Sequence, residues 1–130
     1  MEATEGGTRR HLRDLVSALD PQAFRVSLAV SCGREAAFRA DDLPAYRARG
    51  VAVHEVPMRR GLSPVADARS FVRLVRAIRR VRPDVIHAHS SKAGFLARLA
   101  GAVCRVPVVY TPHVFPFLMG CGADVCFFYW

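Results

Sequence analysis

Lysine is almost absent from this sequence, and several familiar motifs are missing altogether. Of 19 basic residues, Lys92 is the single lysine. Four cysteines occur, but none forms a C-x-x-C pair or a spacing typical of a zinc ribbon, so we expect reduced thiols. No G-x-G-x-x-G motif is present, which argues against a dinucleotide site and against an NAD-dependent oxidoreductase.

Composition and charge narrow the class of protein. The 130 residues are about one domain in length, and a hydrophobic content of 52% excludes disorder as the main state. The net charge of +8 favours anionic partners such as nucleic acid, an anionic membrane or phosphorylated small molecules. Because the arginines lie at helical spacing between aliphatic residues and are not interleaved with aromatics, we expect no nucleic acid partner.

One uncharged run, residues 106–123, approaches the length of a membrane span. It contains Pro107, Pro112, Pro116 and Gly120, and this density of helix breakers predicts a strand followed by a loop. The first residues show no basic segment before an apolar one, so we expect no signal peptide and a cytoplasmic location.

Hydrophobic periodicity predicts an alternation of helices and strands. An apolar stripe at Leu12, Leu15, Val16 and Leu19 marks the first helix, which ends at the Asp20-Pro21 pair. We expect further helices at 43–48, from Pro64 to about 82, and around 96–103, with strands at 24–30, 51–56, 85–89 and 106–110.

This alternation predicts an α/β fold: a Rossmann-like parallel sheet with helices on both faces. Such a sheet opens with a strand that leads into a glycine-rich turn, but only five residues precede Gly6. We therefore expect the first strand to be truncated in this sequence.

A glycine pair stands at the start of the first predicted helix. Gly6 and Gly7, followed by Thr8, would let a phosphate approach the free backbone N–H groups at the positive end of the helix. A tight turn that needs a positive φ explains the pair equally well.

Polar residues follow the strand predicted at 85–89, where α/β sheets bind their ligands. Alternation along the strand sends His87 and His89 to the same face. We interpret His87 as packed and hydrogen-bonded. For His89, at the end of the strand, a packed residue and a residue that contacts a ligand are equally good interpretations. Ser90 or Ser91 could cap the next helix.

His113 follows the last predicted strand and is expected to open into the same crevice as His89. A histidine there can donate to an anionic or hydroxylated group or orient a reacting sugar. Zinc would need a third ligand, so we expect no metal. Asp67 complements the dipole of the basic helix, whereas Arg60, on the loop before that helix, has no such structural explanation.

Residues 2–20, 56–101 and 106–119 together resemble the N-terminal half of family 4-like glycosyltransferases of the GT-B fold, of the kind that build capsular and extracellular polysaccharides. The resemblance implies a bacterial enzyme that retains the anomeric configuration. It would need no metal and no cofactor, and would take a nucleotide-sugar as co-substrate. In such enzymes the N-terminal domain holds most of the acceptor, and the C-terminal domain holds most of the donor.

The resemblance also implies roles for individual residues. His113 would lie beside the transferred sugar as the catalytic residue. The donor diphosphate would contact Gly6, Gly7 and Thr8. The acceptor side would be lined by Arg60, His89, Ser90, Ser91 and Lys92.

Two features depart from the family pattern. The donor domain with its paired carboxylates is absent from this sequence, and the tail at 120–130 does not look like the helical continuation that the family shows. We expect residues 1–119 to form an incomplete N-terminal domain, a frameshift to explain the tail, and this chain alone to be inactive.

The function expected from these observations is transfer of a sugar to a lipid-linked or polysaccharide acceptor at the cytoplasmic face of the membrane. The basic helix from Pro64 could contact anionic lipid, although a solvated charged face explains its pattern as well. The alternative is a non-catalytic Rossmann-like module that binds a nucleotide or a phosphosugar.

Overall fold

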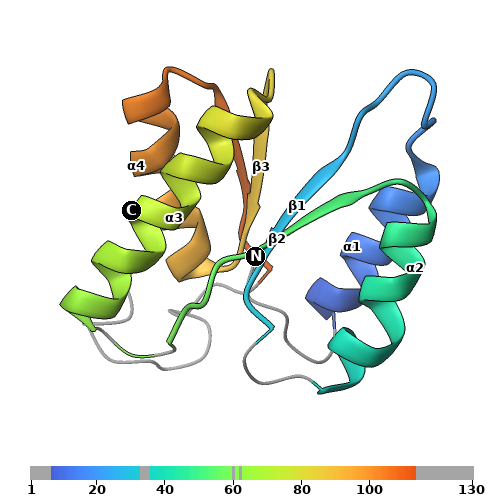
Figure 1. The fold of residues 1–130 in the computed structure, drawn as a ribbon, viewed down its shortest axis with the longest axis horizontal. Helices are drawn as coiled ribbons and strands as arrows, with labels where there is room; N and C mark the ends of the chain where they lie inside the picture. Colours follow the sequence, from blue (N-terminus) through green and yellow to red (C-terminus); the bar gives the residue numbers. More distant parts are fainter. Residues whose placement is uncertain (1–6, 33–35, 60, 62, 114–130) are drawn as a thin grey trace. The chain divides into compact units, whose positions relative to one another are not determined.

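The computed structural model of the chain describes residues 7–32, 36–59, 61 and 63–113. The chain divides into two compact units, the N-terminal unit (residues 2–58) and the C-terminal unit (from residue 59 onward). Each unit contains one pair of parallel strands joined by a helical connection (Figure 1). The predicted truncated first strand and the tail at 120–130 lie outside the described residues, as does the predicted boundary at residue 119.

The N-terminal unit contains the four predicted elements in the predicted order and, between the first strand and the second helix, one turn that was not predicted. They are helix α1 (Gly7–Ala18), strand β1 (Ser27–Val30), a π-helical turn η1 (Phe38–Asp42), helix α2 (Leu43–Ala48) and strand β2 (Ala52–Glu55). The predicted strand at 24–30 is too long, because the N–H of Phe24 donates to the carbonyl of Asp20 in the preceding turn. The N–H of Val51 likewise bonds to the carbonyl of Tyr46 and so belongs to the end of α2.

Apolar side chains of α1, β1, η1 and α2, with Val51 and Val56 on either side of β2, form the core of the N-terminal unit. Helix α1 contributes Leu12 and Val16, which are two members of the predicted stripe. The largest side chain that is fully enclosed is that of Phe38 in η1, a turn that periodicity did not predict. Further buried residues are Leu28, Val30, Leu43, Tyr46, Val51 and Val56.

The C-terminal unit contains helix α3 (Pro64–Val81), strand β3 (Ile86–His89), helix α4 (Ser91–Cys104) and strand β4 (Val108–Thr111). Helix α3 begins at Pro64 as predicted, since proline suits the first helical position. It ends where Arg82 adopts a left-handed conformation, with φ 51°, directly before Pro83. Strand β4 begins at Val108, one residue after Pro107, which has no N–H to donate.

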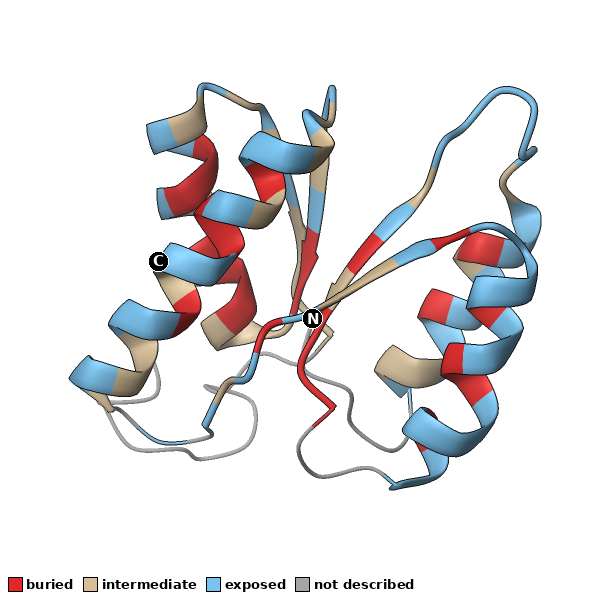
Figure 2. Cartoon of the chain, in the orientation of Figure 1, coloured by how far each residue is buried: buried red, intermediate tan, exposed pale blue. Residues whose placement is uncertain are grey.

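Helix α4 packs on the strand pair through small residues. A Cβ at Gly94 would collide with the ring of Tyr110, and a Cβ at Gly101 would collide with the side chain of Val108. Figure 2 shows the buried faces of α3 and α4. They consist of Leu74, Val75 and Ile78 on α3, with Ala93, Leu96, Ala97 and Ala100 on α4.

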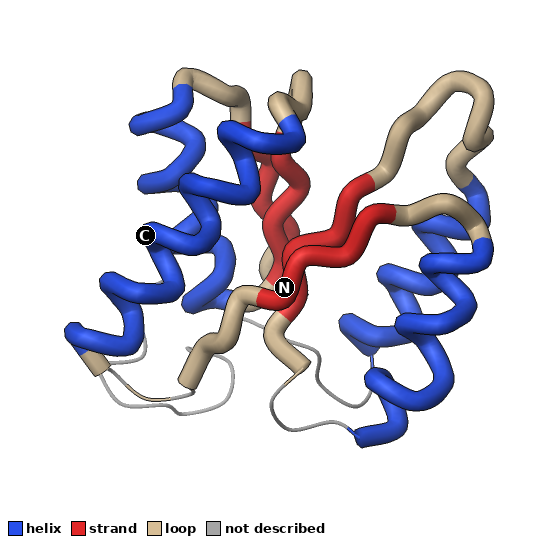
Figure 3. Tube along the Cα trace, in the orientation of Figure 1, coloured by secondary structure: helices blue, strands red, loops and turns tan. Residues whose placement is uncertain are grey.

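The parallel pairing and the helical connections confirm the predicted Rossmann-like α/β class (Figure 3). In both units a strand is followed by a helix and then by a second strand parallel to the first. Among the described residues, no helix combines the length and the hydropathy needed to cross a bilayer.

Candidate functional site

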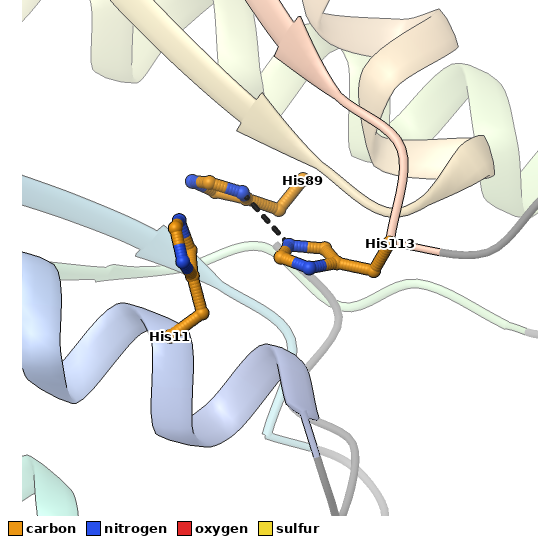
Figure 4. Close-up of side chains that lie close together, drawn as sticks. All are labelled: His11, His89 and His113. Carbon is orange, nitrogen blue, oxygen red and sulfur yellow. Dashed lines mark hydrogen bonds between the residues drawn. The ribbon is translucent and has the colours of Figure 1, made fainter.

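Imidazole and hydroxyl side chains meet at the carboxyl ends of β3 and β4. In the strand register His87 lies opposite Val109, and His89 lies opposite Thr111. The Nε2 atom of His87 is 2.8 Å from Oγ1 of Thr111. The Nδ1 atom of His89 is 3.1 Å from Nε2 of His113, as the dashed line in Figure 4 marks. Each histidine of β3 therefore reaches the residue two positions beyond its register partner, which is the usual diagonal contact across a strand pair.

The ring of His89 lies in contact with both of the other imidazoles of this unit. Its centroid is 4.2 Å from that of His87 and 5.2 Å from that of His113. The predicted common face of His87 and His89 is thus confirmed. His89 is only 4% exposed.

The interpretation of His87 as a packed residue is wrong, although its hydrogen bond was expected. Helix α4 packs on the face of the strand pair that carries Tyr110. Side chains alternate along a strand, so His87 points to the opposite face, where it is exposed together with its register partner Val109.

The pair of His89 and His113 could also be considered as metal ligands. A separation of 3.1 Å between the two nitrogens is close to the spacing of two ligands on one tetrahedral ion. Catalytic zinc takes three protein ligands, and this pair supplies two. The absence of a metal remains a prediction.

Ser90 links the end of β3 to the start of α4 in a strained conformation. Its φ of 67° and ψ of 154° lie where residues other than glycine are rare. Ser90 occupies the helix N-cap position, but its side chain makes no capping bond, because capping side chains require an extended backbone with negative φ. Among the described residues, its buried Oγ has no hydrogen-bond partner. Ser91 is the first residue of α4.

Lys92 lies in the first turn of α4 and holds a loop and a second helix together. Its ammonium donates to the backbone carbonyls of Arg59, at 2.7 Å, and of Gly61. The third bond, also 2.7 Å, goes to Oδ1 of Asp67 on α3. The side chains of Lys92 and Asp67 are only 13% and 17% exposed, so this is a shielded ion pair.

Asp67 completes this arrangement, which we call the lysine clamp: Lys92, Asp67 and the backbone of Arg59, Gly61 and Ser63. The other carboxylate oxygen of Asp67 accepts the N–H of Ser63 at 3.0 Å, while its own N–H donates to the carbonyl of Ser63 at 2.7 Å. The sequence interpretation assigned Asp67 only to the helix dipole and missed the clamp. The ammonium of Lys92 has three N–H donors, and each of them already has a protein oxygen as its acceptor. A role of Lys92 in acceptor binding stays a prediction.

Two of the predicted donor-phosphate residues belong to the N-terminal unit. Gly7 is exposed and begins α1, and Thr8, the next residue, is half-buried. The first turn of this helix contains no acidic residue, so no carboxylate of its own offsets the positive end of the dipole. The described residues include neither Gly6 nor Arg60, the other predicted contacts.

Helix α1 is fastened to η1 by two guanidinium groups on one buried carboxylate. Arg9 binds Oδ2 of Asp42, and Arg13 binds Oδ1 at 2.6 Å. The hydrogen bond to Asp42 raises the pKa of each of the two arginines above its usual value. The sequence offered no signal for this pairing, since Asp42 lies about thirty residues from either arginine.

Comparison with known proteins identifies the family. The sequence model of the glycosyl transferase 4-like domain matches residues 6–128. The chain belongs to this glycosyltransferase family. The resemblance inferred from the sequence is thereby confirmed, together with the Rossmann-like α/β class.

A curated relative is the UDP-Gal:alpha-D-GlcNAc-diphosphoundecaprenol alpha-1,3-galactosyltransferase of Escherichia coli. It is 39% identical to the chain over 59 residues, which are 45% of this chain and 15% of the length of the relative. No solved structure matches the chain significantly.

Proposed function

We propose that this glycosyl transferase 4-like domain forms the acceptor side of a retaining, metal-independent glycosyltransferase of the GT-B fold. Its co-substrate would be a nucleotide-sugar, and its acceptor a lipid-linked or polysaccharide glycan. The observation that carries the proposal is the hydrogen-bonded pair of His89 and His113 at the carboxyl ends of two parallel strands, where α/β sheets bind ligands.

The chemistry of this pair suits a sugar substrate. A ring nitrogen of His113 can donate to or accept from a hydroxyl group of the transferred sugar and so orient it. The charge that develops on the diphosphate leaving group would be stabilised by helix N-termini and positive side chains, which is electrostatic catalysis without a metal. We assign Gly6, Gly7 and Thr8 to the donor phosphate, and Arg60, Ser90, Ser91 and Lys92 to the acceptor side, where the family resemblance also implies a contact for His89.

The name of the relative supports the choice of substrates and of stereochemistry. That enzyme takes UDP-galactose as donor and a diphosphoundecaprenol-linked GlcNAc as acceptor, and it makes an alpha-1,3 linkage. The sugar of UDP-galactose is α-linked, so an α-linked product means retention of configuration. We extend this chemistry to the present domain as part of the proposal.

Because the resemblance implies that this domain works together with a donor domain, the test is a transfer assay on the chain fused to the C-terminal part of the relative. The substrates are UDP-galactose and a short-chain GlcNAc-diphospholipid, and the product linkage is determined by NMR. We expect His113→Ala to lower turnover by about 10²- to 10⁴-fold, the usual contribution of a positioned acid or base. His54→Ala, which removes a strand histidine of the N-terminal unit, is the matched control. Full turnover by His113→Ala would remove His113 from the mechanism, and binding without transfer would favour the non-catalytic module.

A membrane-linked acceptor gives a role to the outer face of α3. A groove along this helix is lined by the apolar side chains of Val65, Ala68 and Val72 and by several arginines. Val65 is 66% exposed and Val72 is 44% exposed. The acidic residue of the helix, Asp67, is engaged in the lysine clamp. The arginines of α3 are Arg69, Arg73, Arg76, Arg79 and Arg80.

Apolar side chains framed by arginines are typical of helices that lie on an anionic bilayer surface. Peripheral contact with the inner face of the plasma membrane is therefore part of the proposal. Each arginine near such a surface contributes about 1 kcal/mol. The double variant Arg73→Glu/Arg76→Glu should thus weaken sedimentation with anionic liposomes by at least ~30-fold. The exposed pair Arg25→Glu/Arg47→Glu in the N-terminal unit is the control, and no binding at low salt would refute the membrane contact.

A further inference from the structure

We propose that His89 is a positioning residue: its buried ring sets the orientation and the protonated nitrogen of the His113 ring. The part of this proposal that concerns sugar transfer rests on the proposed function. The part that concerns the tautomers of the two rings does not. It differs from the role in acceptor binding that the family resemblance implies for His89.

The two rings differ in how firmly the fold holds them. His89 is the last residue of β3, its backbone belongs to the strand ladder, and its side chain is 4% exposed. The ring of His87 lies against it at a centroid distance of 4.2 Å. His113 follows β4 by two residues and is half-buried. The hydrogen bond between Nδ1 of His89 and Nε2 of His113 therefore joins the buried ring of a strand residue to the half-buried ring of a residue beyond the strand.

This bond couples the proton positions of the two neutral rings. A neutral imidazole carries one N–H, on either Nδ1 or Nε2. If Nε2–H of His113 donates, Nδ1 of His89 must be bare, and both rings are Nε2–H tautomers. If Nδ1–H of His89 donates, Nε2 of His113 must be bare, and both rings are Nδ1–H tautomers. The structure therefore requires the same tautomer on both rings.

The shared tautomer has a consequence for the substrate. Because the bond to His89 engages Nε2, the nitrogen that His113 turns toward any other group is Nδ1. The tautomer then decides whether Nδ1 donates to a sugar hydroxyl or accepts from one. A protonated pair would place two N–H donors against each other at 3.1 Å, so the bond persists only while at least one ring is neutral.

Two substitutions separate the hydrogen bond from the shape of the side chain. His89→Phe keeps a planar ring but removes both nitrogens. His89→Asn places an amide, which can donate or accept, near the former position of Nδ1. His54→Phe on β2 is the matched control for the loss of a strand histidine.

The first readout is the ¹⁵N spectrum of the ring nitrogens in the labelled chain at a pH where the histidines are neutral. We expect one common tautomer for His89 and His113 in the unmodified protein and in His54→Phe. His89→Phe should convert His113 to a mixture of tautomers, and His89→Asn should restore a single one. Opposite tautomers on the two rings, or a His113 spectrum that His89→Phe leaves unchanged, would overturn the proposal.

The second readout is the transfer assay, analysed as kcat and KM. A positioning role predicts that His89→Phe lowers kcat by roughly 10- to 100-fold with an unchanged acceptor KM, and that His89→Asn recovers most of this loss. A raised KM at unchanged kcat would instead assign His89 to acceptor binding. If His113→Ala remained active, the proposed catalytic role of His113 would be wrong. The tautomer coupling would still be tested independently by the ¹⁵N spectra.

Discussion

At the carboxyl end of β1 and β2 the described contacts are backbone hydrogen bonds, one serine and an exposed ion pair of Arg39 with Glu55, whereas at the same end of β3 and β4 imidazoles and a threonine hydroxyl meet. The N–H of Val56 donates to the carbonyl of Val30, and Oγ of Ser31 accepts the N–H of Met58 at 3.0 Å. In the C-terminal unit the corresponding positions carry His89, Thr111 and the bond to His113.

The difference arises within one architecture, because both pairs are parallel and both are joined through helices. The residue that ends each strand contributes to the difference, because His89 ends β3 whereas Val30 ends β1. In the described part of the C-terminal unit, the imidazole cluster lies beside a charged element, the lysine clamp, which fixes the neighbouring loop.

The largest effect on the stability of the C-terminal unit is expected from Lys92→Met, which removes the lysine clamp. It leaves the carboxylate of Asp67 and two loop carbonyls without their donor in a shielded place. Loss of one partner of a buried ion pair costs about 3–5 kcal/mol, and we expect the lower end because both side chains keep some exposure. Thermal unfolding should show a Tm lower by roughly 10 °C or more.

Two controls define the origin of this loss. Arg76→Met removes an exposed charge from α3 and should change the unfolding free energy by less than about 0.5 kcal/mol. The double variant Lys92→Met/Asp67→Leu removes both charges and should recover part of the stability. An unchanged Tm for Lys92→Met would show that the clamp is not a stabilising element.

The lysine clamp also shows where sequence reasoning stops. The start of α3 at Pro64 and the common face of His87 and His89 followed from local periodicity, which depends on neighbouring residues alone. The partners of Lys92 include two backbone carbonyls from a loop that lies about thirty residues earlier. No pattern of residue types reveals such an acceptor, so the sequence could not show which groups Lys92 binds within the unit.

The turn η1 escaped sequence analysis for a related reason. Its buried Asp42 binds Arg9 and Arg13 of α1, and the enclosed ring of its Phe38 lies 6.2 Å from the ring of Tyr46 on α2. These contacts between distant segments compensate for a π-helical turn that local propensity does not favour. Local patterns therefore predicted the helices and strands, and distant contacts decided the exceptions.

A smaller effect is expected where α4 meets the strands. Gly101→Ala gains roughly 1 kcal/mol of helix propensity, but the new Cβ would meet the side chain of Val108 and lie 2.9 Å from the carbonyl of Val106. Overpacking costs about 1–3 kcal/mol, so the net change should be a destabilisation of ~1 kcal/mol, measured by urea unfolding. Gly7→Ala on α1 meets nothing within 4 Å and should not destabilise, and equal effects of the two changes would contradict this difference between the units.

The smallest expected effect concerns a thiol rather than stability. Cys32, just beyond β1, is 7% exposed, and burial, together with the nearby Glu55, raises the pKa of its thiol. A raised pKa means less thiolate at neutral pH, so iodoacetamide should label Cys32 more slowly than the half-buried Cys104, as measured by peptide mass spectrometry. Because the folded state prefers the neutral thiol, this group stabilises the fold below its ordinary pKa, and that contribution is lost as the pH rises through the raised value. Labelling of Cys32 should therefore accelerate at alkaline pH. Urea should abolish the difference in labelling rate between Cys32 and Cys104. Equal rates for the two thiols in the folded protein would contradict the prediction, because they would mean that iodoacetamide reaches the end of β1 as readily as the end of α4.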